Sequence, residues 1–344
     1  MMERSVATLL TIPEDAREVL IAVNPHAGAG NRRAVVEEFC TDLAARGLRG
    51  KPIDQIDALA GEAGRLLAAG QLRAVVAAGG DGTLRLVAER TPSGTPLAVL
   101  PLGTENLLAR YLELTASPQQ LAAVVAAGLA CRLDAGQANG QFFSLMAGCG
   151  FDADVVRRLH EARRGHIHHL SYAKPILDAI RSYEYPELRV RYAPAESADD
   201  ELSAEIAARW VFVVNLPRYA GGLSFAPKAS GADGLLDVCT FKEGSLWYGL
   251  MYLGGVMLGQ HESMQDFVRV RTRRLRIESS GPVPLQLDGD PGGTLPAEIR
   301  VLPQRLTLLV ARSWAERQGF ANSFNPEPEA TAAKGKQPAP PAAG

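Results

Sequence analysis

Short apolar runs that end in loops of small residues recur along the first third of the chain. Two of these runs, at 19–23 and 97–102, lead into segments with helical spacing. A third, at 75–78, leads into Gly-Gly-Asp-Gly-Thr at 79–83 and a helical segment at 84–89. Apolar runs of this length predict buried strands. Alternation with helices predicts a parallel α/β sheet whose loops meet at the carboxyl edge of the strands, where nucleotides bind.

Further elements follow from the same patterns. We expect a strand at 51–59 and helices at 33–43, 63–69, 107–112 and 121–127. After residue 131 the pattern changes to short alternating or apolar runs separated by Gly and Pro. They lie at 142–147, 188–192, 208–214, 236–241, 268–277, 283–287, 299–302 and 306–310. Many short strands of this kind predict a β-sandwich or barrel-like second domain. Helical segments at 153–182 and 244–259 interrupt it.

This division gives four parts. We expect an N-terminal extension at 1–16, an α/β domain at 17–132, a β-sandwich domain at 133–312 and a C-terminal segment at 313–344. Beyond about residue 324 the sequence is rich in Pro, Ala, Glu and Lys, a composition that predicts disorder.

Composition argues against nucleic-acid binding and leaves the role of one apolar stretch open. The 36 basic and 38 acidic residues nearly cancel, so no global field favours nucleic acid. Four isolated cysteines and the absence of a signal-peptide pattern predict a cytoplasmic protein. The apolar stretch 246–258 is too short to span a bilayer. It predicts a buried helix, with a helix that touches the membrane surface as the alternative.

The glycine loop at 79–83 has two interpretations. Glycines let another group approach the backbone, and a helix N-terminus binds anions, so the loop predicts a phosphate site. A carboxylate such as Asp81 beside phosphate needs Mg²⁺ or a transferable proton between them, as in phosphoryl transfer. The alternative is an ordinary strand-to-helix turn in which Asp81 caps the helix.

Six motifs in order carry a resemblance to a known family. They are Asn24-Pro25-x-x-Gly28, Gly79-Gly80-Asp81-Gly82-Thr83, Pro101-x-Gly103-Thr104-x-Asn106, Gly148-x-Gly150-x-Asp152-Ala153, Ala226-Pro227-x-Ala229 with Asp233-Gly234-x-x-Asp237, and Leu287-Asp288-Gly289-Asp290. From about residue 20 to 312 the chain resembles the diacylglycerol kinase catalytic family, in particular its soluble bacterial lipid kinases. The resemblance implies a nucleotide-binding α/β domain similar to that of NAD kinases and phosphofructokinases. It also implies a β-sandwich that holds the lipid, with the active site between the two.

The activity that the resemblance implies is transfer of the γ-phosphate of ATP, with Mg²⁺, to a hydroxyl of diacylglycerol or a related lipid at a membrane surface. A peripheral membrane contact and a homodimer are expected with it. Asn24 and Asn106 either contact the nucleotide or close local turns. The complete set of implied ATP-binding residues is Asn24, Pro25, Gly28, Gly79, Gly80, Asp81, Gly82, Thr83, Gly103, Thr104 and Asn106.

The resemblance also implies the catalytic and metal-binding residues. Asp290 is the implied base, although the family usually has Asp-Gly-Glu at this place, and Asp81 is its rival. The alternative is a plain turn, because Asp-Gly favours hairpins. The residues that match a structural Mg²⁺ site in bacterial members are Ser230, Asp233 and Leu235, although Asp233-Gly234 also makes a tight turn without an ion.

Two departures from the family pattern bear on nucleotide preference. Leu107 stands where many bacterial members have an aspartate, and 57–59 lacks a threonine that many members have. Two rival functions stay open: an NAD kinase, which shares the glycine loop, and a nucleotide- or lipid-binding protein without activity. His160, His166, His168 and His169 fit no familiar metal spacing and indicate a solvated basic helix. That helix, with Arg269, Arg271 and Arg273, is a candidate contact for anionic headgroups.

Overall fold

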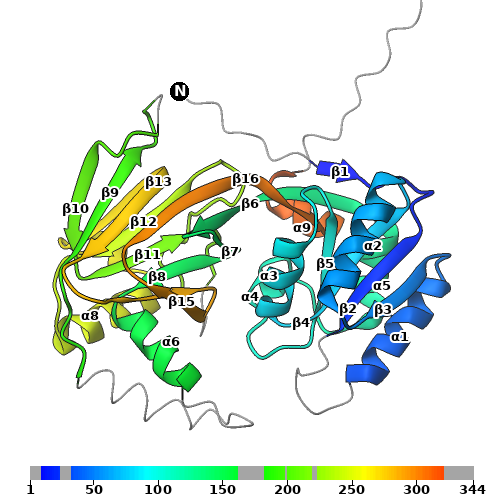
Figure 1. Ribbon diagram of the computed structural model, residues 1–344, viewed down its shortest axis with the longest axis horizontal. Coiled ribbons are helices and arrows are strands. Elements are labelled where there is room, and N and C mark those ends of the chain that lie inside the picture. Colours follow the sequence, from blue (N-terminus) through cyan, green and yellow to red (C-terminus); the bar gives the residue numbers. More distant parts are fainter. Residues whose placement is uncertain (1–8, 24–31, 162–181, 198–199, 219–222, 321–344) are drawn as a thin grey trace, which may run out of the picture.

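The computed structural model describes residues 9–23, 32–161, 182–197, 200–218 and 223–320. They form two lobes that lie side by side and are joined by long strands across the top (Figure 1). The first lobe is α/β and the second is a β-sandwich with helices at its lower edge. Both domain types were predicted from the alternation of apolar runs.

Four parallel strands form the centre of the first lobe, in the order β3-β2-β4-β5. They are β2 (Glu18–Val23), β3 (Arg49–Ile53), β4 (Leu72–Gly79) and β5 (Pro96–Pro101). The helices are α1 (Arg32–Ala44), α2 (Ile56–Ala68), α3 (Asp81–Arg90), α4 (Leu107–Tyr111) and α5 (Pro118–Ala127). Helix α1 packs with α5 and α2 packs with α3. All eight residues of β4 are buried, as expected for a central parallel strand.

One predicted element of this lobe is wrong. A strand at 51–59 was expected, but β3 ends at Ile53 and α2 begins at Ile56. Leu59, Ala63 and Leu66 are the buried residues of α2. Their spacing of four and three residues places them on one side of a helix, and that side packs into the core. Residues 56–59 therefore belong to the helix and not to a strand.

The second lobe is an antiparallel sandwich. Its main path runs β15-β14-β8-β11-β12-β13, with β9 and β10 added at β13. The strands are β7 (Gln141–Phe143), β8 (Met146–Cys149), β9 (Leu188–Pro194), β10 (Ala204–Ala208), β11 (Trp210–Val214), β12 (Leu236–Phe241), β13 (Phe267–Ser279), β14 (Pro284–Leu287) and β15 (Asp290–Thr294). Its helices are α6 (Phe151–Glu161), α8 (Leu246–Met257) and the short η3 (His261–Ser263). A buried cluster that includes Leu236, Leu275 and Leu285 fills its interior.

Two long strands join the lobes. β6 (Leu129–Ala138) and β16 (Ala297–Leu309) pair antiparallel, and β6 also pairs with the short β1 (Leu9–Thr11). The start of β16 pairs with β13 in the second lobe, whereas Thr307 and Leu308 pair in parallel with β5 in the first. The helix α9 (Arg312–Arg317) follows, and its Trp314 is fully buried in the first lobe's core. Residues 306–315, which we assigned beyond the first domain, therefore complete that domain's core.

The burial predicted for the apolar stretch 246–258 is wrong. It forms α8 as expected, but Trp247 is 73% exposed, Met257 is 70% exposed and Leu258 is 73% exposed. Only Tyr252, Gly255 and Val256 of this helix are buried. Sequence alone does not say which side of an all-apolar helix is covered. None of the helices among the described residues has both the length and the hydropathy needed to cross a bilayer.

Candidate active site

The carboxyl edge of the parallel sheet brings two glycine loops into contact. A Cβ atom added to Gly103, after β5, would lie 2.5 Å from the Cα of Gly80, after β4. A Cβ added to Gly79 would lie 2.3 Å from Oγ1 of Thr83. Real Cβ atoms do not approach this closely, so the loops need glycine to pack. The predicted convergence of these loops at one edge is confirmed.

Asp81 ties the two loops together through its carboxylate. Oδ2 accepts a hydrogen bond of 2.9 Å from the N–H of Leu107, and Oδ1 accepts one of 3.1 Å from Leu108. The carboxylate therefore caps the start of α4 while its backbone begins α3. Burial raises the pKa of Asp81, and the two hydrogen bonds oppose this. Each oxygen still has a lone pair for another partner.

The amide of Asn106 closes the second loop. Its oxygen accepts from Gly103 N–H at 3.0 Å and its nitrogen donates to Gly103 O at 2.9 Å. Asn106 itself has a left-handed backbone, with φ of 50°. Nucleotide contact by Asn106 and by the exposed Thr104 stays a prediction. Three further residues of the predicted ATP site, Asn24, Pro25 and Gly28, lie outside the described residues.

The turn between β14 and β15 holds two aspartates with different surroundings. Asp288 is partly buried, and its two oxygens accept four hydrogen bonds: from Ser144 N–H, Ser144 Oγ, Leu145 N–H and Met146 N–H, at 2.7–3.0 Å. A carboxylate with four donors is fully satisfied. Asp288 is therefore an anchor that fixes the turn to the start of β8.

Asp290 points out of the same turn toward the first lobe. Its Oδ2 lies 3.0 Å from Nη2 of Arg85 on α3 and 3.4 Å from where a Cβ of Gly82 would stand. Its side chain stays 33% exposed. The structure thus brings together the two predicted elements, the glycine loop and the Asp-Gly-Asp turn, from positions about 200 residues apart in sequence.

Arg85 was missed by the sequence analysis. No motif includes it, but it lies three residues after Gly82 on a helix, so both fall on one side of α3. That spacing was the available signal. Its side chain is 22% exposed, and its guanidinium lies between the glycine loop and the candidate base. A guanidinium in this position can bind a phosphoryl group or orient the carboxylate.

The predicted structural Mg²⁺ site receives no support from the geometry. Oδ1 of Asp233 accepts from the N–H of Leu235, and Oδ2 forms an ion pair of 3.1 Å with Arg271. A cation at this carboxylate would compete with the guanidinium. The site at Ser230, Asp233 and Leu235 stays a prediction, and no step below depends on a metal there.

An apolar cavity of about 220 Å³ lies between α6, α8 and the sheet. We call it the aromatic pocket, because Phe151, Tyr185, Trp210, Phe212, Phe225, Phe241 and Tyr252 line it. A hydrogen-bonded chain joins it to the Asp-Gly-Asp turn. Gln286 donates to Asp152 Oδ2 at 3.0 Å, and its oxygen accepts from Gly289 N–H at 2.8 Å. Asp152 also lines the pocket.

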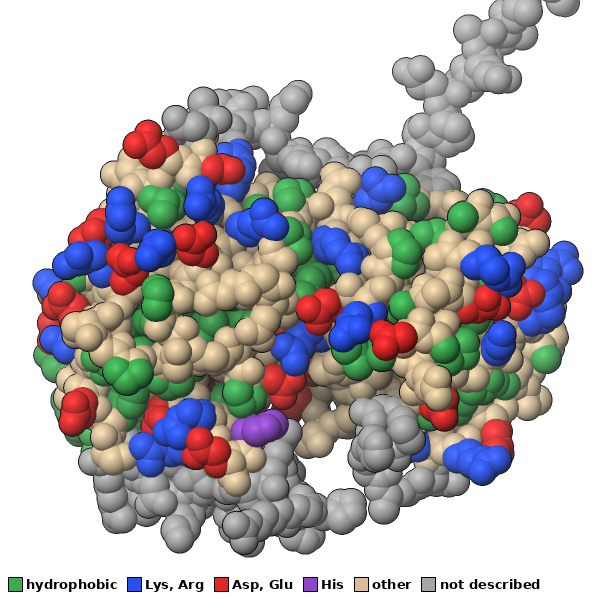
Figure 2. Space-filling model, viewed as in Figure 1, with side chains coloured by type: hydrophobic (Ala, Val, Ile, Leu, Met, Phe, Trp, Pro, Cys, Tyr) green, Lys and Arg blue, Asp and Glu red, His purple; other side chains and the backbone are tan. Residues whose placement is uncertain are grey.

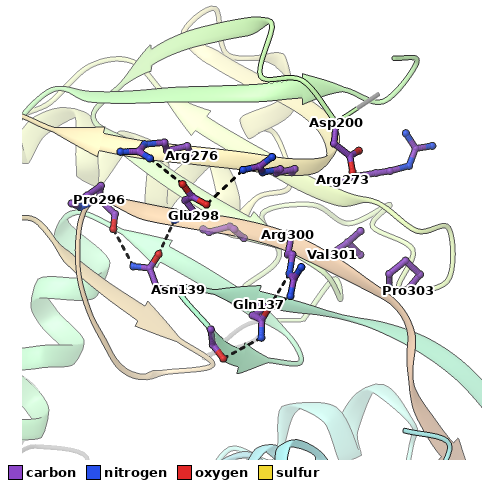
Figure 3. A pocket seen from close by; sticks show the side chains of 13 residues that line it. Gln137, Asn139, Asp200, Arg273, Arg276, Pro296, Glu298, Arg300, Val301 and Pro303 are labelled. Atoms are coloured by element: carbon purple, nitrogen blue, oxygen red, sulfur yellow. Dashed lines mark hydrogen bonds and ion pairs between the residues drawn. The ribbon is translucent and has the colours of Figure 1, made fainter. Parts of the chain in front are cut away.

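A larger hollow of about 960 Å³ lies on the second lobe, over β6, β13 and β16 (Figure 3). Several of its charged and polar side chains are already paired with one another. Glu298 binds Arg274 and Arg276, and Arg300 donates to Gln137. None of the glycine-loop residues lines it. We therefore place the candidate site where Asp290 and Arg85 meet the glycine loop, and not here.

The basic residues proposed as headgroup contacts also have partners. Arg157 and Arg158 both pair with Asp154 on α6. Arg269 pairs with Asp237, and Arg271 with Asp233. Blue and red side chains alternate over the face shown in Figure 2, without one large field of either sign. Three of the four clustered histidines, His166, His168 and His169, lie outside the described residues.

An α/β lobe with glycine loops at its sheet edge, beside a β-sandwich whose Asp290 reaches those loops, is the two-domain fold class of diacylglycerol kinases. Family models agree. Residues 18–138 match the diacylglycerol kinase catalytic domain, and residues 146–310 match the YegS C-terminal NAD kinase beta sandwich-like domain.

Individual relatives point the same way. The chain is 30% identical over 295 residues to a Pseudomonas fluorescens protein named probable lipid kinase YegS-like, covering 81% of this chain and 95% of that one. It is 28% identical over 249 residues to a diacylglycerol kinase of Bacillus subtilis, covering 71% and 79%. The fold matches the crystal structure of a diacylglycerol kinase from Bacillus anthracis, with a TM-score of 0.63, 22% identity and coverage of 87% and 98%. The chain belongs to the family of diacylglycerol kinase-like lipid kinases.

Proposed function

We propose that this protein transfers the γ-phosphate of ATP to a hydroxyl of diacylglycerol or a closely related lipid. The observation that carries the proposal is the position of Asp290, whose carboxylate lies beside Gly82 of the glycine loop. A base must be within reach of the hydroxyl that it deprotonates, and that hydroxyl must be in line with the transferred phosphorus.

The first lobe supplies the anion site. The loop from Gly79 to Gly82 opens the ten-residue helix α3, so its N–H groups and the helix dipole face bound phosphate. Asp81 retains lone pairs that suit a Mg²⁺ ion brought with ATP, which would offset charge on the transferred group. Arg85, one turn further along α3, adds a fixed positive charge at the same place.

The second lobe supplies the acceptor. Asp290 accepts the proton of the lipid hydroxyl while the hydroxyl oxygen bonds to the γ-phosphorus. The bond between the γ-phosphorus and the oxygen that links it to the β-phosphate breaks, which releases ADP. The aromatic pocket is connected to the Asp-Gly-Asp turn through Gln286 and accommodates the apolar part of the lipid. Its apolar lining supports a lipid acceptor over a soluble one such as NAD⁺, because it offers few partners for the polar groups of NAD⁺.

The test is transfer of label from γ-labelled ATP, with Mg²⁺, to diacylglycerol in mixed micelles, with NAD⁺ in a parallel tube. We expect labelled phosphatidic acid, and no label in that lipid with Asp290→Asn. Labelled NADP⁺ would instead identify an NAD kinase. ATP binding without any labelled product would identify a binding protein. A series of related lipid alcohols then ranks the acceptors.

A further inference from the structure

Helix α8 exposes an apolar surface that the proposed reaction leaves unexplained. Among the described residues nine large hydrophobic side chains are exposed, and seven of these lie between 246 and 258. The stretch contains no Asp, Glu, Lys, Arg or His. Exposed apolar surface that is gathered on one element marks an interaction site, whereas scattered single residues do not.

The helix has two distinct sides. Tyr252, Gly255 and Val256 pack against the sandwich. Trp247, Leu250 and Met257 lie at spacings of three and seven residues, which places them together on the opposite side. We call this side the apolar face. With 12 residues the helix is about 18 Å long, so it can lie along a membrane surface but cannot cross it.

The apolar face is continuous with the aromatic pocket. Leu246, Leu250 and Leu253 line that pocket and are also 43%, 53% and 44% exposed. One row of side chains is thus both the wall of the pocket and part of the outer surface. Another protein or a second copy of this chain could cover this wall but would block it. A bilayer covers the same wall and also contains the lipid that the pocket would bind.

We propose that α8 docks the protein on a lipid bilayer, lying in the interface with its apolar face among the acyl chains. The residue types suit this position, because Trp and Tyr favour the membrane interface while Leu and Met bury in the chains. Delivery of substrate from this surface into the aromatic pocket rests on the proposed lipid kinase activity. Docking itself does not.

Trp247 makes docking measurable in the unmodified protein. The chain has three tryptophans, and the other two, Trp210 and Trp314, are 7% and 0% exposed. On adding phosphatidylcholine vesicles without diacylglycerol, so that no acceptor enters the aromatic pocket beside Trp210, we expect a blue shift of emission and quenching by lipids brominated on the acyl chains. Trp247→Phe should show neither change. No shift at saturating vesicles would overturn the proposal, as would a shift that appears on concentrating the protein without vesicles, since that identifies a second copy as the occupant.

Variants separate docking from catalysis. Trp247 and Met257 are exposed and do not line the aromatic pocket, so Trp247→Glu/Met257→Glu leaves the pocket intact. We expect this variant to bind vesicles at least about tenfold more weakly. The control for an added carboxylate is Leu86→Glu, which places one of the two charges at a 40% exposed leucine of α3, away from α8. Binding should survive 0.5 M NaCl (about 3–5 Å screening length), because the apolar face has no charge to screen.

Turnover completes the test. The double variant should lose about as much activity on long-chain diacylglycerol in vesicles as it loses in binding, and keep wild-type activity on a short-chain diacylglycerol dissolved without a bilayer. Equal losses on both substrates would overturn the proposal and indicate damage to the site. If the wild-type protein phosphorylates neither lipid, the proposed function fails while the fluorescence result still decides docking.

Discussion

Nη2 of Arg85 and Oδ2 of Asp290 lie 3.0 Å apart, and they come from different lobes. This ion pair spans the cleft in which we place phosphoryl transfer. It fixes the carboxylate beside Gly82 and compensates for an acid side chain one methylene shorter than the glutamate usual in the family. The pair is partly exposed, so its contribution to folding stability is small, at most about 1 kcal/mol. Its importance is therefore positional.

Asp290→Asn should lower kcat for lipid phosphorylation by about 10²-fold or more, because the amide cannot accept the hydroxyl proton. The KM for ATP should change little. Steady-state kinetics in mixed micelles check this, with Asp57→Asn as the control, since Asp57 is an exposed aspartate of α2. Wild-type kcat in Asp290→Asn would leave Asp81 as the candidate base.

Arg85→Met should lower kcat by about tenfold, and Arg85→Lys should recover part of the loss because it keeps the charge without the guanidinium's fork. If Arg85 acts through Asp290, the double variant Arg85→Met/Asp290→Asn should be no slower than Asp290→Asn alone. A double variant that is slower by the product of both losses would show that Arg85 acts on phosphate directly. Urea unfolding should give nearly equal stabilities for all these proteins.

Asp288→Ala should behave in the opposite way. It leaves the N–H groups of Ser144, Leu145 and Met146 without their acceptor in a buried place. An unsatisfied buried donor costs about 1–3 kcal/mol, so we expect a loss of about 3 kcal/mol or more in the free energy of unfolding. Urea titration followed by circular dichroism measures it. A stability equal to that of wild type would contradict the anchoring role.

Buried Tyr111 should make the fold less stable at alkaline pH. Burial, with a smaller contribution from Cys131, raises the pKa of Tyr111 to about 12 from an ordinary value of 10. Above pH 10 the unfolded chain loses this proton while the folded one keeps it, so stability falls as the pH rises from 10 to 12. Tyr111→Phe removes this term and keeps the edge contact between the ring and Trp314. The difference in free energy of unfolding, variant minus wild type, should therefore be about 1 kcal/mol more favourable to the variant at pH 11 than at pH 8. Parallel urea titrations at both pH values test this, and an unchanged difference would contradict it.

The two-lobed fold could be predicted because it rests on local signals, since an apolar run that ends in glycines specifies its own strand and loop. The meeting of the glycine loop with the Asp-Gly-Asp turn was expected only from the family resemblance, because the two lie about 200 residues apart. The difference between Asp288 and Asp290 could not be predicted. Both lie in one turn, and only the position of β8 decides which carboxylate meets four donors.

The ion pair of Arg85 and the exposure of α8 could not be predicted from the sequence, for a related reason. The spacing of Arg85 from Gly82 places it on the side of α3 that faces the glycine loop, but its partner lies 205 positions away and no local pattern indicates it. The apolar pattern of α8 is the same whether its outer side meets protein, water or lipid. Solvent exposure depends on what packs from elsewhere, and the hydrophobic pattern of one segment does not contain that information.

The strand β16 has a consequence for how the protein is made. Thr307 and Leu308 pair with β5, and Trp314 fills the first lobe's core, so the lobe built mainly from the beginning of the chain is closed by residues near its end. Those residues leave the ribosome after every strand of the sandwich, the start of β16 included. The edge of β5 that pairs with β16 therefore stays open while the second lobe is being synthesised, so the first lobe, although it is translated first, must wait for its last strand.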